Sequence, residues 1–531
     1  MRAGLGVAAA RGLFASGLAV TGLATGTRRA EAVTATDHEP YGSLEGRSPD
    51  AHGLVLPEGF TARVVAEGGT PVAGTDWLWP LFPDGKGTIP IGDGGWLLAC
   101  NHEVFDFQTP RLPHGGASTV SFDAEGRITG AWPILEGSHS NSRGAATPWG
   151  TWLSCQEVHG AGGGDGAGLI WECDPTGERP AMPRPALGVR THGSVAVNSA
   201  DGRCYLTEAH RDGRLYRFTP SQGGLASESL EAGVLEAMAV DLDSSVTWLP
   251  VADPTGTVAP TRVQAAAATV IPMGGGVAVH DETLWFTTGL DDRVHVVDLT
   301  AGRHRVAWDG MRRRRPLAGI GDLTVSPAGE VFAVEDRGDM EVVLLSPSVG
   351  GDSDGGDVAR PFCRMVGDGH RFSAVTGPCF DPSGTRMYVS SLRGRGEALV
   401  RDVVSELDWG DGVEGRHVGV TYEVTGPFHE PEVVTAGDGS VGSVATTTLV
   451  APGTTTPGTT TPATTSAAPR TTLVPSSTAP ATTGPPPPTT IGPGAIDTPG
   501  DGGTWTAAWG VGAGVLAAGG AVVALRRRRG G

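Results

Sequence analysis

Seven side chains in this sequence are of types that could together bind metal ions. Carboxylates are the ligands that hard cations such as calcium prefer, and a thiolate would add one soft ligand. Each of the seven lies at or just beyond the end of a short apolar run. The alternative to a metal site is that these residues are solvated strand ends. The set consists of Asn101, Glu103, Cys155, Glu157, Glu208, Glu335 and Asp336.

These residues belong to a pattern that recurs along the chain. A Gly or an acidic residue precedes four or five mostly apolar residues, and a polar or acidic residue follows them. Runs rich in Val, Leu, Trp, Tyr and Phe between turn residues predict strands, and their unbroken apolar character predicts burial on both faces. Six copies, with start-to-start spacings of 55, 52, 80, 47 and 55 residues, are Gly95–Asn101, Gly150–Gln156, Gly202–Glu208, Glu282–Thr288, Gly329–Glu335 and Gly384–Ser390.

Repeats of about 50 residues that hold several strands each predict an all-β fold, a six-bladed β-propeller. Equivalent strands around one axis bring equivalent positions together, so we expect the polar strand ends near one mouth of the central channel. The longest spacing contains an insertion, Pro250–Ala268, which is expected to form a loop or short helix on one rim. The six strand ends are Asn101, Gln156, Glu208, Thr288, Glu335 and Ser390.

Composition supports this fold and excludes other classes of protein. The chain has 83 Gly and 40 Pro among 531 residues, about 23% and roughly twice the usual share, which excludes a helical bundle or coiled coil. The net charge is −19 and Lys86 is the single lysine. A basic surface for nucleic acid is therefore not expected.

The order of motifs between residues 53 and 428 resembles the PhoX family of exported alkaline phosphatases. That resemblance implies a six-bladed propeller with an iron–calcium cluster at one end of its channel. The motifs are Gly53–Phe60, Trp79–Gly85, Asp93–Trp96, Asn101–Glu103, Gly150–Glu157, Cys204–Glu208, Leu215–Phe218, Leu323–Pro327, Glu335–Asp336, Gly377–Gly384 and Thr421–Pro427.

The resemblance implies a role for each candidate residue. Asn101 would hold a phosphate oxygen, and Cys155 would supply the thiolate that binds iron. The carboxylates would bind metal, and they are Glu103, Glu157, Glu208, Glu335 and Asp336.

Several positions depart from the family pattern. Gln156 replaces a Glu of the motif around Cys155, and Met273 stands where the family has a phosphate-binding Arg. Each lost carboxylate removes one anionic ligand, and the lost Arg removes a bidentate clamp. The other altered positions, in each of which an acidic residue is expected, are Gly193, Ala209, Gly275 and Ala374.

Six cysteines in an exported chain could form three disulfides. Cys100 has the same offset as Cys155 one repeat earlier, so a bridge between them competes with the iron-ligand role of Cys155. Cys363 and Cys379 form the next candidate bridge.

Both ends of the chain predict export and membrane attachment. Residues 1–32 have the charge, apolar run and small-residue end of a signal peptide. The propeller is expected over residues 50–430, followed by a disordered Thr/Pro-rich stalk over 431–503. Residues 504–531 predict a transmembrane helix with a basic cytoplasmic tail, which anchors the chain on the outer face of the membrane. A cleaved sorting tail is the alternative for this last segment.

Two functions remain open from the sequence. The first is a PhoX-like metal-dependent phosphatase, a monomer that hydrolyses small phosphate monoesters outside the cell with calcium and iron. The second is a non-catalytic or calcium-binding surface propeller that binds a partner or ligand, because several ligand positions are altered. A calcium-dependent lactonase or esterase is a further enzymatic alternative, by analogy of fold.

Overall fold

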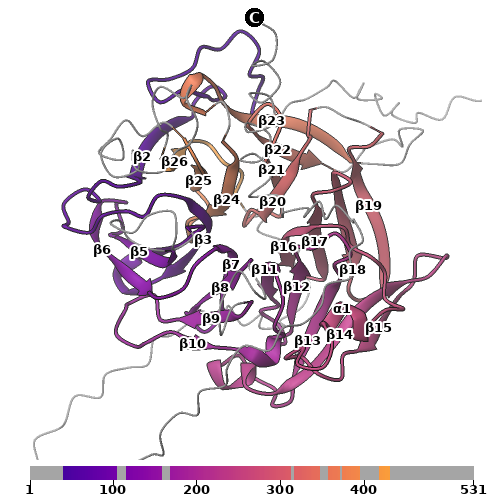
Figure 1. Cartoon of the computed structure of the whole chain (residues 1–531). Helices are drawn as coiled ribbons and strands as arrows, with labels where there is room; N and C mark the ends of the chain where they lie inside the picture. Colours follow the sequence, from indigo (N-terminus) through magenta and orange to yellow (C-terminus); the bar gives the residue numbers. More distant parts are fainter. Residues whose placement is uncertain are drawn as a thin grey trace, which may run out of the picture.

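The computed structural model describes residues 40–104, 115–157, 168–312, 316–346, 357–370, 373–394 and 418–430. In these residues, six antiparallel sheets are arranged as blades around a central axis (Figure 1). The all-β, six-bladed architecture predicted from the repeats is confirmed. The predicted signal segment, stalk and transmembrane helix lie outside the described residues, and no helix within the described ranges is long and apolar enough to span a membrane.

Blades 1 to 3 follow one another in chain order. From the axis outward, blade 1 contains β3 (Pro83–Pro90), β4 (Trp96–His102), β5 (Gly116–Phe122) and β6 (Ile128–Leu135). Blade 2 contains β7 (Asn141–Ala146), β8 (Trp152–Gln156), β9 (Ile170–Cys173) and β10 (Met182–Pro183). Blade 3 has five strands, β11 (His192–Val197), β12 (Cys204–Glu208), β13 (Leu215–Pro220), β14 (Gly233–Val240) and β15 (Val246–Pro250).

Blades 4 to 6 complete the ring. Blade 4 contains β16 (Gly274–His280), β17 (Thr283–Thr288), β18 (Arg293–Asp298) and β19 (Arg303–Asp309). Blade 5 contains β20 (Ile320–Val325), β21 (Val331–Glu335), β22 (Glu341–Ser346), β23 (Val358–Met365) and β1 (Leu54–Val55). Blade 6 contains β24 (Val375–Phe380), β25 (Arg386–Ser391), β26 (Val420–Thr425) and β2 (Thr61–Glu67).

Helices are few and short in the described part of the chain. The α-helix α1 (Thr261–Gln264) lies within the insertion between blades 3 and 4, as the sequence predicted. The 3₁₀ helices are η1 (Gly92–Gly94), η2 (Pro185–Leu187), η3 (Ser227–Leu230) and η4 (Asp368–His370).

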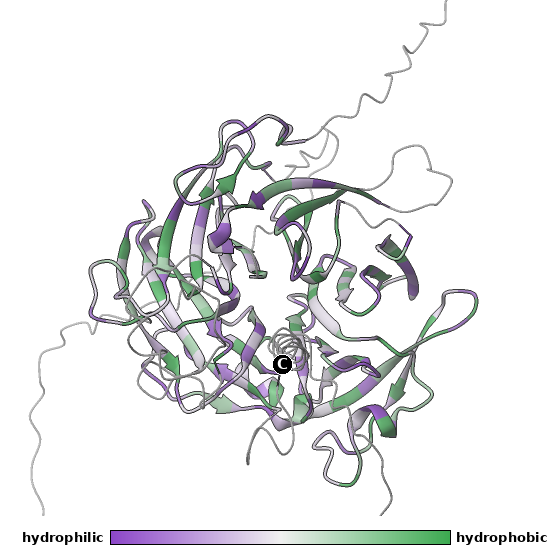
Figure 2. Cartoon of the chain, turned by 45° about the horizontal axis from the view of Figure 1, so that its top comes forward, coloured by the Kyte–Doolittle hydropathy of each residue, from purple (hydrophilic) through white to green (hydrophobic). Residues whose placement is uncertain are grey.

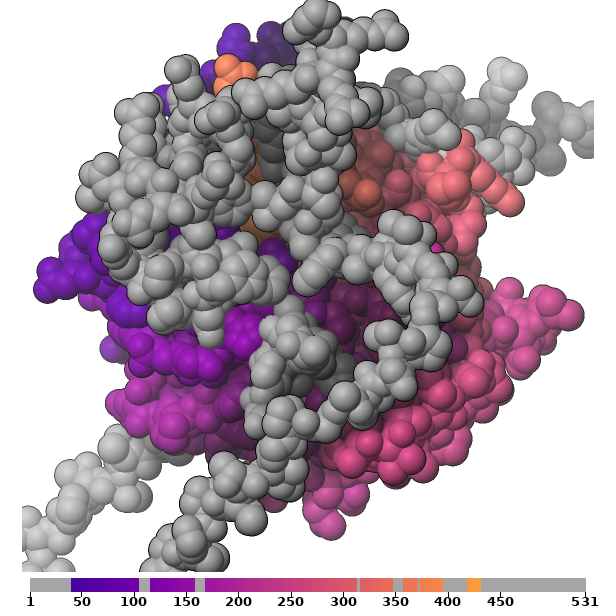
Figure 3. Space-filling view, viewed as in Figure 1, coloured from indigo at the N-terminus to yellow at the C-terminus, as the bar shows by residue number. Residues whose placement is uncertain are grey.

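The N-terminal strands close the ring. Strand β2 pairs with β26 as the outermost strand of blade 6, although the two are far apart in sequence. Glu423 of β26 is buried and forms ion pairs with Arg63 of β2 at 2.8 Å and with Arg386 of β25 at 2.9 Å. The order of colours around the space-filling view follows the chain from blade to blade (Figure 3).

Apolar side chains pack mainly between neighbouring sheets. One cluster joins blades 2 and 3 and includes Leu153, Cys155, Val195 and Leu206, all at most 1% exposed. Hydrophobic and hydrophilic residues are mixed along the strands around the whole ring (Figure 2). The sequence repeats correspond to the second strand of each blade, which explains their unbroken apolar character, since a second strand is covered on both faces.

All six innermost strands carry a register shift near the same end of the channel. The shifts fall between Pro83 and Lys86 in β3 and between Asn141 and Gly144 in β7, and equivalent ones occur in β11, β16, β20 and β24. A β-bulge re-aims the side chains next to it and bends the strand. The bulges therefore decide which groups face the channel.

Candidate functional site

A cavity of about 40 Å³ lies at the end of the channel where the bulges occur. The residue directly after the second strand of every blade lines it. The sequence placed the polar ring one or two residues too early, at the strand ends. Successive side chains along a strand point to opposite faces, so an offset of one residue decides whether a side chain faces the cavity. The six lining positions are Glu103, Glu157, Ala209, Gly289, Asp336 and Leu392.

The bulges of the innermost strands supply the other charged groups. Asp84 comes from the bulge of β3 and Arg143 from the bulge of β7. Gly85 lets these two bulges approach, since a Cβ there would lie 2.5 Å from the Cα of Arg143. Arg393, next to Leu392, adds a second guanidinium and lies 4.0 Å from Glu103 Oε2.

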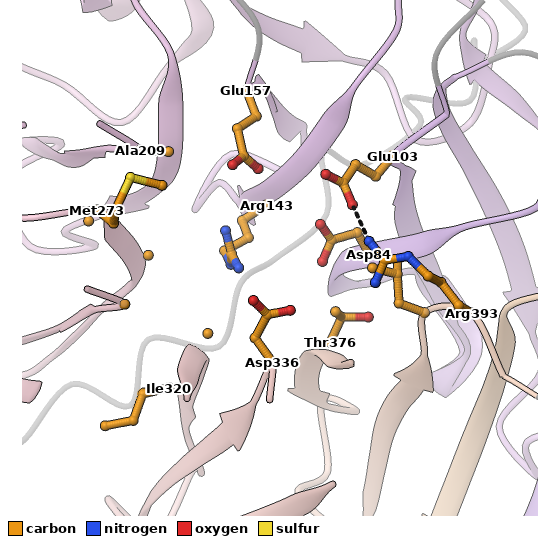
Figure 4. A pocket seen from close by; sticks show the side chains of 15 residues that line it. Asp84, Glu103, Arg143, Glu157, Ala209, Met273, Ile320, Asp336, Thr376 and Arg393 are labelled. Atoms are coloured by element: carbon orange, nitrogen blue, oxygen red, sulfur yellow. Dashed lines mark ion pairs between the residues drawn. The ribbon is translucent and has the colours of Figure 1, made fainter. Parts of the chain in front are cut away.

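The cavity has a charged half and a bare half (Figure 4). Blades 1, 2, 5 and 6 supply the charged groups, among them Glu157 and Asp336. Blades 3 and 4 contribute Ala209, Met273 and glycines instead. Its volume accommodates about three water-sized spheres, so it has room for a small polar group or one end of a larger molecule.

Burial and mutual repulsion favour the protonated form of the carboxyl groups. Burial, together with the nearby Glu157 and Asp84, raises the pKa of Glu103 to about 8 against the opposing charge of Arg393. Burial also raises the pKa of Glu157 to about 7 and that of Asp84 to about 6, against the opposing charge of Arg143. At neutral pH the cavity therefore contains both neutral and ionised carboxyl groups.

Arg143 points into the middle of the acidic groups (Figure 4). Burial lowers its pKa, but the carboxylates of Asp84, Asp322, Glu157 and Asp336 outweigh burial and raise the pKa above its ordinary value. Its Nε lies 3.8 Å from Asp322 Oδ2 on β20. The guanidinium thus remains charged and is the central cation of the site.

Asn101 does not line the cavity but holds the strand that carries Arg143. Its Nδ2 donates to the carbonyl oxygens of Ser142 and Arg143 at 3.0 and 2.9 Å, and its Oδ1 accepts from Trp152 Nε1 at 2.8 Å. The side chain is fully buried, and its hydrogen-bond partners Ser142, Arg143 and Trp152 all belong to blade 2. In this arrangement Asn101 fixes the bulge of β7, whereas the family resemblance implied contact with phosphate.

Cys155 lies in the apolar core between blades 2 and 3 and is absent from the cavity lining. It is 0% exposed, and burial raises the pKa of its thiol well above the ordinary value. A thiol in such surroundings stays protonated. All six cysteines are free, so neither candidate bridge, Cys100–Cys155 or Cys363–Cys379, is formed. Cys100 and Cys155 pack in different core clusters.

Glu208 is occupied by the insertion after blade 3. Arg262 of α1 contacts its Oε1 at 2.7 Å, and the Tyr216 hydroxyl donates to its Oε2 at 2.8 Å. The carboxylate is 0% exposed and lies outside the cavity lining. The insertion thus engages Glu208, one of the predicted metal ligands, and the sequence did not reveal this contact.

Glu335 is bound by the turn that follows its own strand and by the segment that precedes β20. Its carboxylate accepts hydrogen bonds from the backbone N–H groups of Ala318, Asp339 and Glu341 at 2.8 to 3.1 Å. Burial raises its pKa to about 7. The next residue, Asp336, faces the cavity in its place.

The comparisons with known proteins agree with this fold. The family model described as alkaline phosphatase PhoX matches residues 113–288. PhoX from Pseudomonas fluorescens, solved in complex with vanadate, has a TM-score of 0.54 at 13% identity, over 72% of this chain and 97% of that one. The PhoX resemblance is confirmed. A comparison with curated protein sequences finds no match.

Two more distant structures also align. Regucalcin from Agrobacterium tumefaciens, described as a calcium-binding protein, has 16% identity and a TM-score of 0.32, over 70% of this chain and 97% of that one. A gluconolactonase from Xanthomonas campestris has 12% identity and a TM-score of 0.34, over 69% and 89%. These scores are too low to indicate a function for this protein.

The iron–calcium site that the PhoX resemblance implies does not fit the residues of this chain. The thiol of Cys155 is buried in apolar core, and Glu208 and Glu335 are engaged elsewhere. Among the described residues, no three His, Cys, Asp or Glu side chains lie close enough together to hold a metal ion. Of the seven predicted residues, the structure brings Glu103, Glu157 and Asp336 to one cavity.

Two of the altered PhoX positions, Gly193 and Gly275, have a structural reason in this chain. A Cβ at Gly193 would lie 2.0 Å from the carbonyl oxygen of Gly274, and one at Gly275 would lie 2.3 Å from that of Gly321. These glycines therefore let the bulges of neighbouring innermost strands touch. Met273 and Ala209 line the bare half of the cavity, and Ala374 is fully buried outside it.

Sequence reasoning missed Asp84, Arg143 and Arg393 as site residues. Asp84 lies inside the motif Trp79–Gly85, but a bulge has no sequence signal beyond the adjacent Gly85. Arg393 was detectable, because it follows the sixth repeat at nearly the offset of Glu103 and Glu157 in the first two. Arg143 had no comparable signal.

Proposed function

We propose that this protein is a PhoX-like propeller that binds the phosphoryl end of a small molecule at the channel mouth without hydrolysing it. One observation carries the proposal: the cavity faces Arg393 and Arg143, while the thiol of the implied iron site is in the core. Guanidinium groups bind phosphate oxygens through paired hydrogen bonds. The proposal keeps the expected extracellular location, membrane anchor and monomeric state.

The charges of the cavity support an anionic ligand of limited size. Arg393 is the more accessible cation, with 34% of its side chain exposed against 14% for Arg143. Its guanidinium lies 4.0 Å from Glu103 Oε2, and both residues line the cavity. Because burial raises the pKa of Glu103 to about 8, this carboxyl is protonated at neutral pH and can donate to a phosphate oxygen.

Calorimetric titration of the purified full chain with inorganic phosphate tests the binding. We expect saturable binding that Arg393→Ala weakens at least roughly tenfold, since one charge-assisted contact is worth about 1.5–3 kcal/mol. Arg217→Ala is the matched control, because Arg217 pairs with Glu236 at 2.6 Å on the outer part of blade 3. Absence of phosphate binding, or equal loss in both variants, would refute the proposal.

Hydrolysis of phosphate monoesters is the second candidate function, and the PhoX family match over residues 113–288 favours it. The same protein, supplied with Ca²⁺ and Fe³⁺, is assayed with p-nitrophenyl phosphate. Our proposal predicts phosphate binding without turnover above the metal-only blank. Turnover that depends on iron, together with stoichiometric iron in the protein, would establish the enzymatic alternative instead.

A further inference from the structure

Two apolar side chains in the bare half of the cavity are buried without belonging to the core. Met273 and Ala209 are 9% and 8% exposed, and both line the cavity. Neither belongs to an apolar core cluster of the described residues, in contrast to Ile320, which lines the cavity and also packs between blades 4 and 5. The buried apolar surface of Met273 and Ala209 therefore faces the cavity and not a neighbouring sheet.

The backbone holds Met273 in a conformation that is uncommon for a residue with a long side chain. Its φ is 56°, in the left-handed region that glycine adopts without strain. Its N–H donates to the carbonyl oxygen of His210 at 2.8 Å, and its own carbonyl oxygen accepts from the N–H of Gly289 at 2.8 Å. The side chain that this backbone presents lies across the cavity from Arg143 (Figure 4).

Polar backbone groups near Met273 already have hydrogen-bond partners. Thr207 Oγ1 donates to the carbonyl oxygen of Gly275 at 2.5 Å, and Thr287 Oγ1 donates to that of Gly321 at 3.1 Å. Both glycines line the cavity. A hydroxyl group placed on this side would give up its bonds to water and meet acceptors that already have donors, whereas an aliphatic group has no such bonds to lose.

We propose that the bare half of the cavity is a subsite for an aliphatic group, so that the ligand is a phosphate monoester of an apolar alcohol. The inference rests on the proposed function, which places the phosphoryl end at Arg393 and Arg143. Because the cavity accommodates about three water-sized spheres, the phosphoryl group occupies the charged half, and the first carbons of the alcohol contact Met273. A thioether side chain adapts its shape to such an apolar group.

Calorimetric titration of the full chain with two ligands of equal carbon number tests the inference, in EDTA so that no metal-dependent hydrolysis consumes them. Both n-propyl phosphate and glycerol phosphate have three carbons, and glycerol phosphate has two additional hydroxyl groups. We expect n-propyl phosphate to bind at least roughly fourfold more tightly, which corresponds to the burial of one CH₂ group at about 0.8 kcal/mol. Met273→Gly should abolish this preference and leave the affinity for inorganic phosphate unchanged, because it removes the apolar contact and keeps both guanidinium groups.

Met340→Gly is the matched control. Met340 has a φ of 59° and is 8% exposed, so it resembles Met273 in both respects, but it packs in the core cluster between blades 5 and 6. This variant should lose stability without changing the ratio of the two affinities. Met273→Leu keeps an apolar side chain and should keep the preference. If Met273→Gly does not fold, Met273→Asn is titrated in its place, since Asn tolerates the left-handed region and also removes the apolar contact.

Two results would overturn the inference and leave the proposed function in place. One is a wild type that binds inorganic phosphate but binds glycerol phosphate as tightly as n-propyl phosphate, or more tightly. The other is a preference for n-propyl phosphate that a folded Met273→Gly or Met273→Asn variant retains in full. If none of the three ligands binds, both the proposed function and this inference are wrong.

Discussion

Asn101 and Arg143 act as a pair in which one residue positions the other. The amide of Asn101 has the hydrogen-bonding groups that suit two carbonyl acceptors and one indole donor, and all of them are used. An aspartate at this position would place a carboxylate oxygen, which cannot donate a hydrogen bond, against the two carbonyl oxygens. The identity of residue 101 therefore follows from the need to hold the β7 bulge.

Asn101→Ala should weaken phosphate binding as well as the fold. We expect a loss of about 1–3 kcal/mol in the free energy of unfolding, because two buried carbonyls and an indole N–H lose their partner. Phosphate affinity should fall because Arg143 is no longer held. Urea denaturation and calorimetry measure the two effects. Asn198→Ala is the control, because Asn198 Oδ1 accepts from the N–H of Ala200 in the turn between β11 and β12, away from the cavity lining. This variant should lose stability without losing affinity.

Cys155 provides a residue-scale test of the metal question. Cys155→Ser places a hydroxyl among apolar side chains, and we expect a cost of about 1–3 kcal/mol in the free energy of unfolding. Cys155→Ala avoids the polar group and should cost less. Neither variant should change phosphate affinity or the metal content found by elemental analysis. Iron present in the wild type and lost in both variants would contradict the core position of this thiol.

At the residue scale, the sequence identified three of the six charged residues that line the cavity. Glu103, Glu157 and Asp336 were predicted and line it, because their offset from a recurring strand is visible as a pattern. Glu208 and Glu335 share that pattern, but tertiary contacts engage them elsewhere. Arg262 of the insertion binds Glu208, and three backbone N–H groups, one before β20 and two after β21, bind Glu335. Such contacts join residues far apart or depend on loop geometry, so no local pattern predicts them.

At the scale of elements, the bulges of the innermost strands determine both the shape and the charge of the channel mouth. Four of the six bulges present mainly glycine backbone, and those of β3 and β7 present Asp84 and Arg143. The second strands were predicted well because their burial on both faces gives them a strong apolar signal. The innermost strands were not, since they are rich in Gly and their apolar pattern is weak.

Restoring a PhoX-like carboxylate should succeed at one altered position and fail at another. Gly275→Glu places a Cβ 2.3 Å from the backbone carbonyl oxygen of Gly321, which lies in the bulge of the neighbouring strand. We expect a loss of about 3 kcal/mol or more in the free energy of unfolding. Ala209 already has a Cβ at the cavity, so Ala209→Asp should cost less. Thermal unfolding of both variants measures the difference. Equal stability of the two would contradict the close contact of the bulges of β16 and β20.

At the scale of the whole molecule, the propeller concentrates buried acidic groups in one place. The chain as a whole has a net charge of −19, and the blades bring Asp84, Glu103 and Glu157 into a cavity whose described cations are Arg143, Arg393 and nearby Lys86. The ring is closed by β2 on blade 6, so its blades are joined end to end. Ionisation of the buried carboxyl groups in the cavity is therefore expected to lower the free energy of unfolding of the whole propeller.

The stability of the protein should fall as the pH rises through the neutral range. Burial raises the pKa of Glu103 to about 8, of Glu157 to about 7 and of Asp84 to about 6, all above their values in an unfolded chain. These three carboxyl groups thus bind more protons in the folded than in the unfolded state between about pH 4.5 and 8, and their deprotonation favours unfolding across that window, whereas the lowered pKa of about 3 of His102 and of His295 acts in the opposite direction below about pH 6.5. The melting temperature should be higher at about pH 5 than at about pH 8. Glu103→Gln should reduce this difference, whereas Glu236→Gln on the outer part of blade 3 should leave it unchanged. A difference between the melting temperatures at about pH 5 and about pH 8 that Glu103→Gln leaves as large as in the wild type would contradict the raised pKa of this carboxyl group.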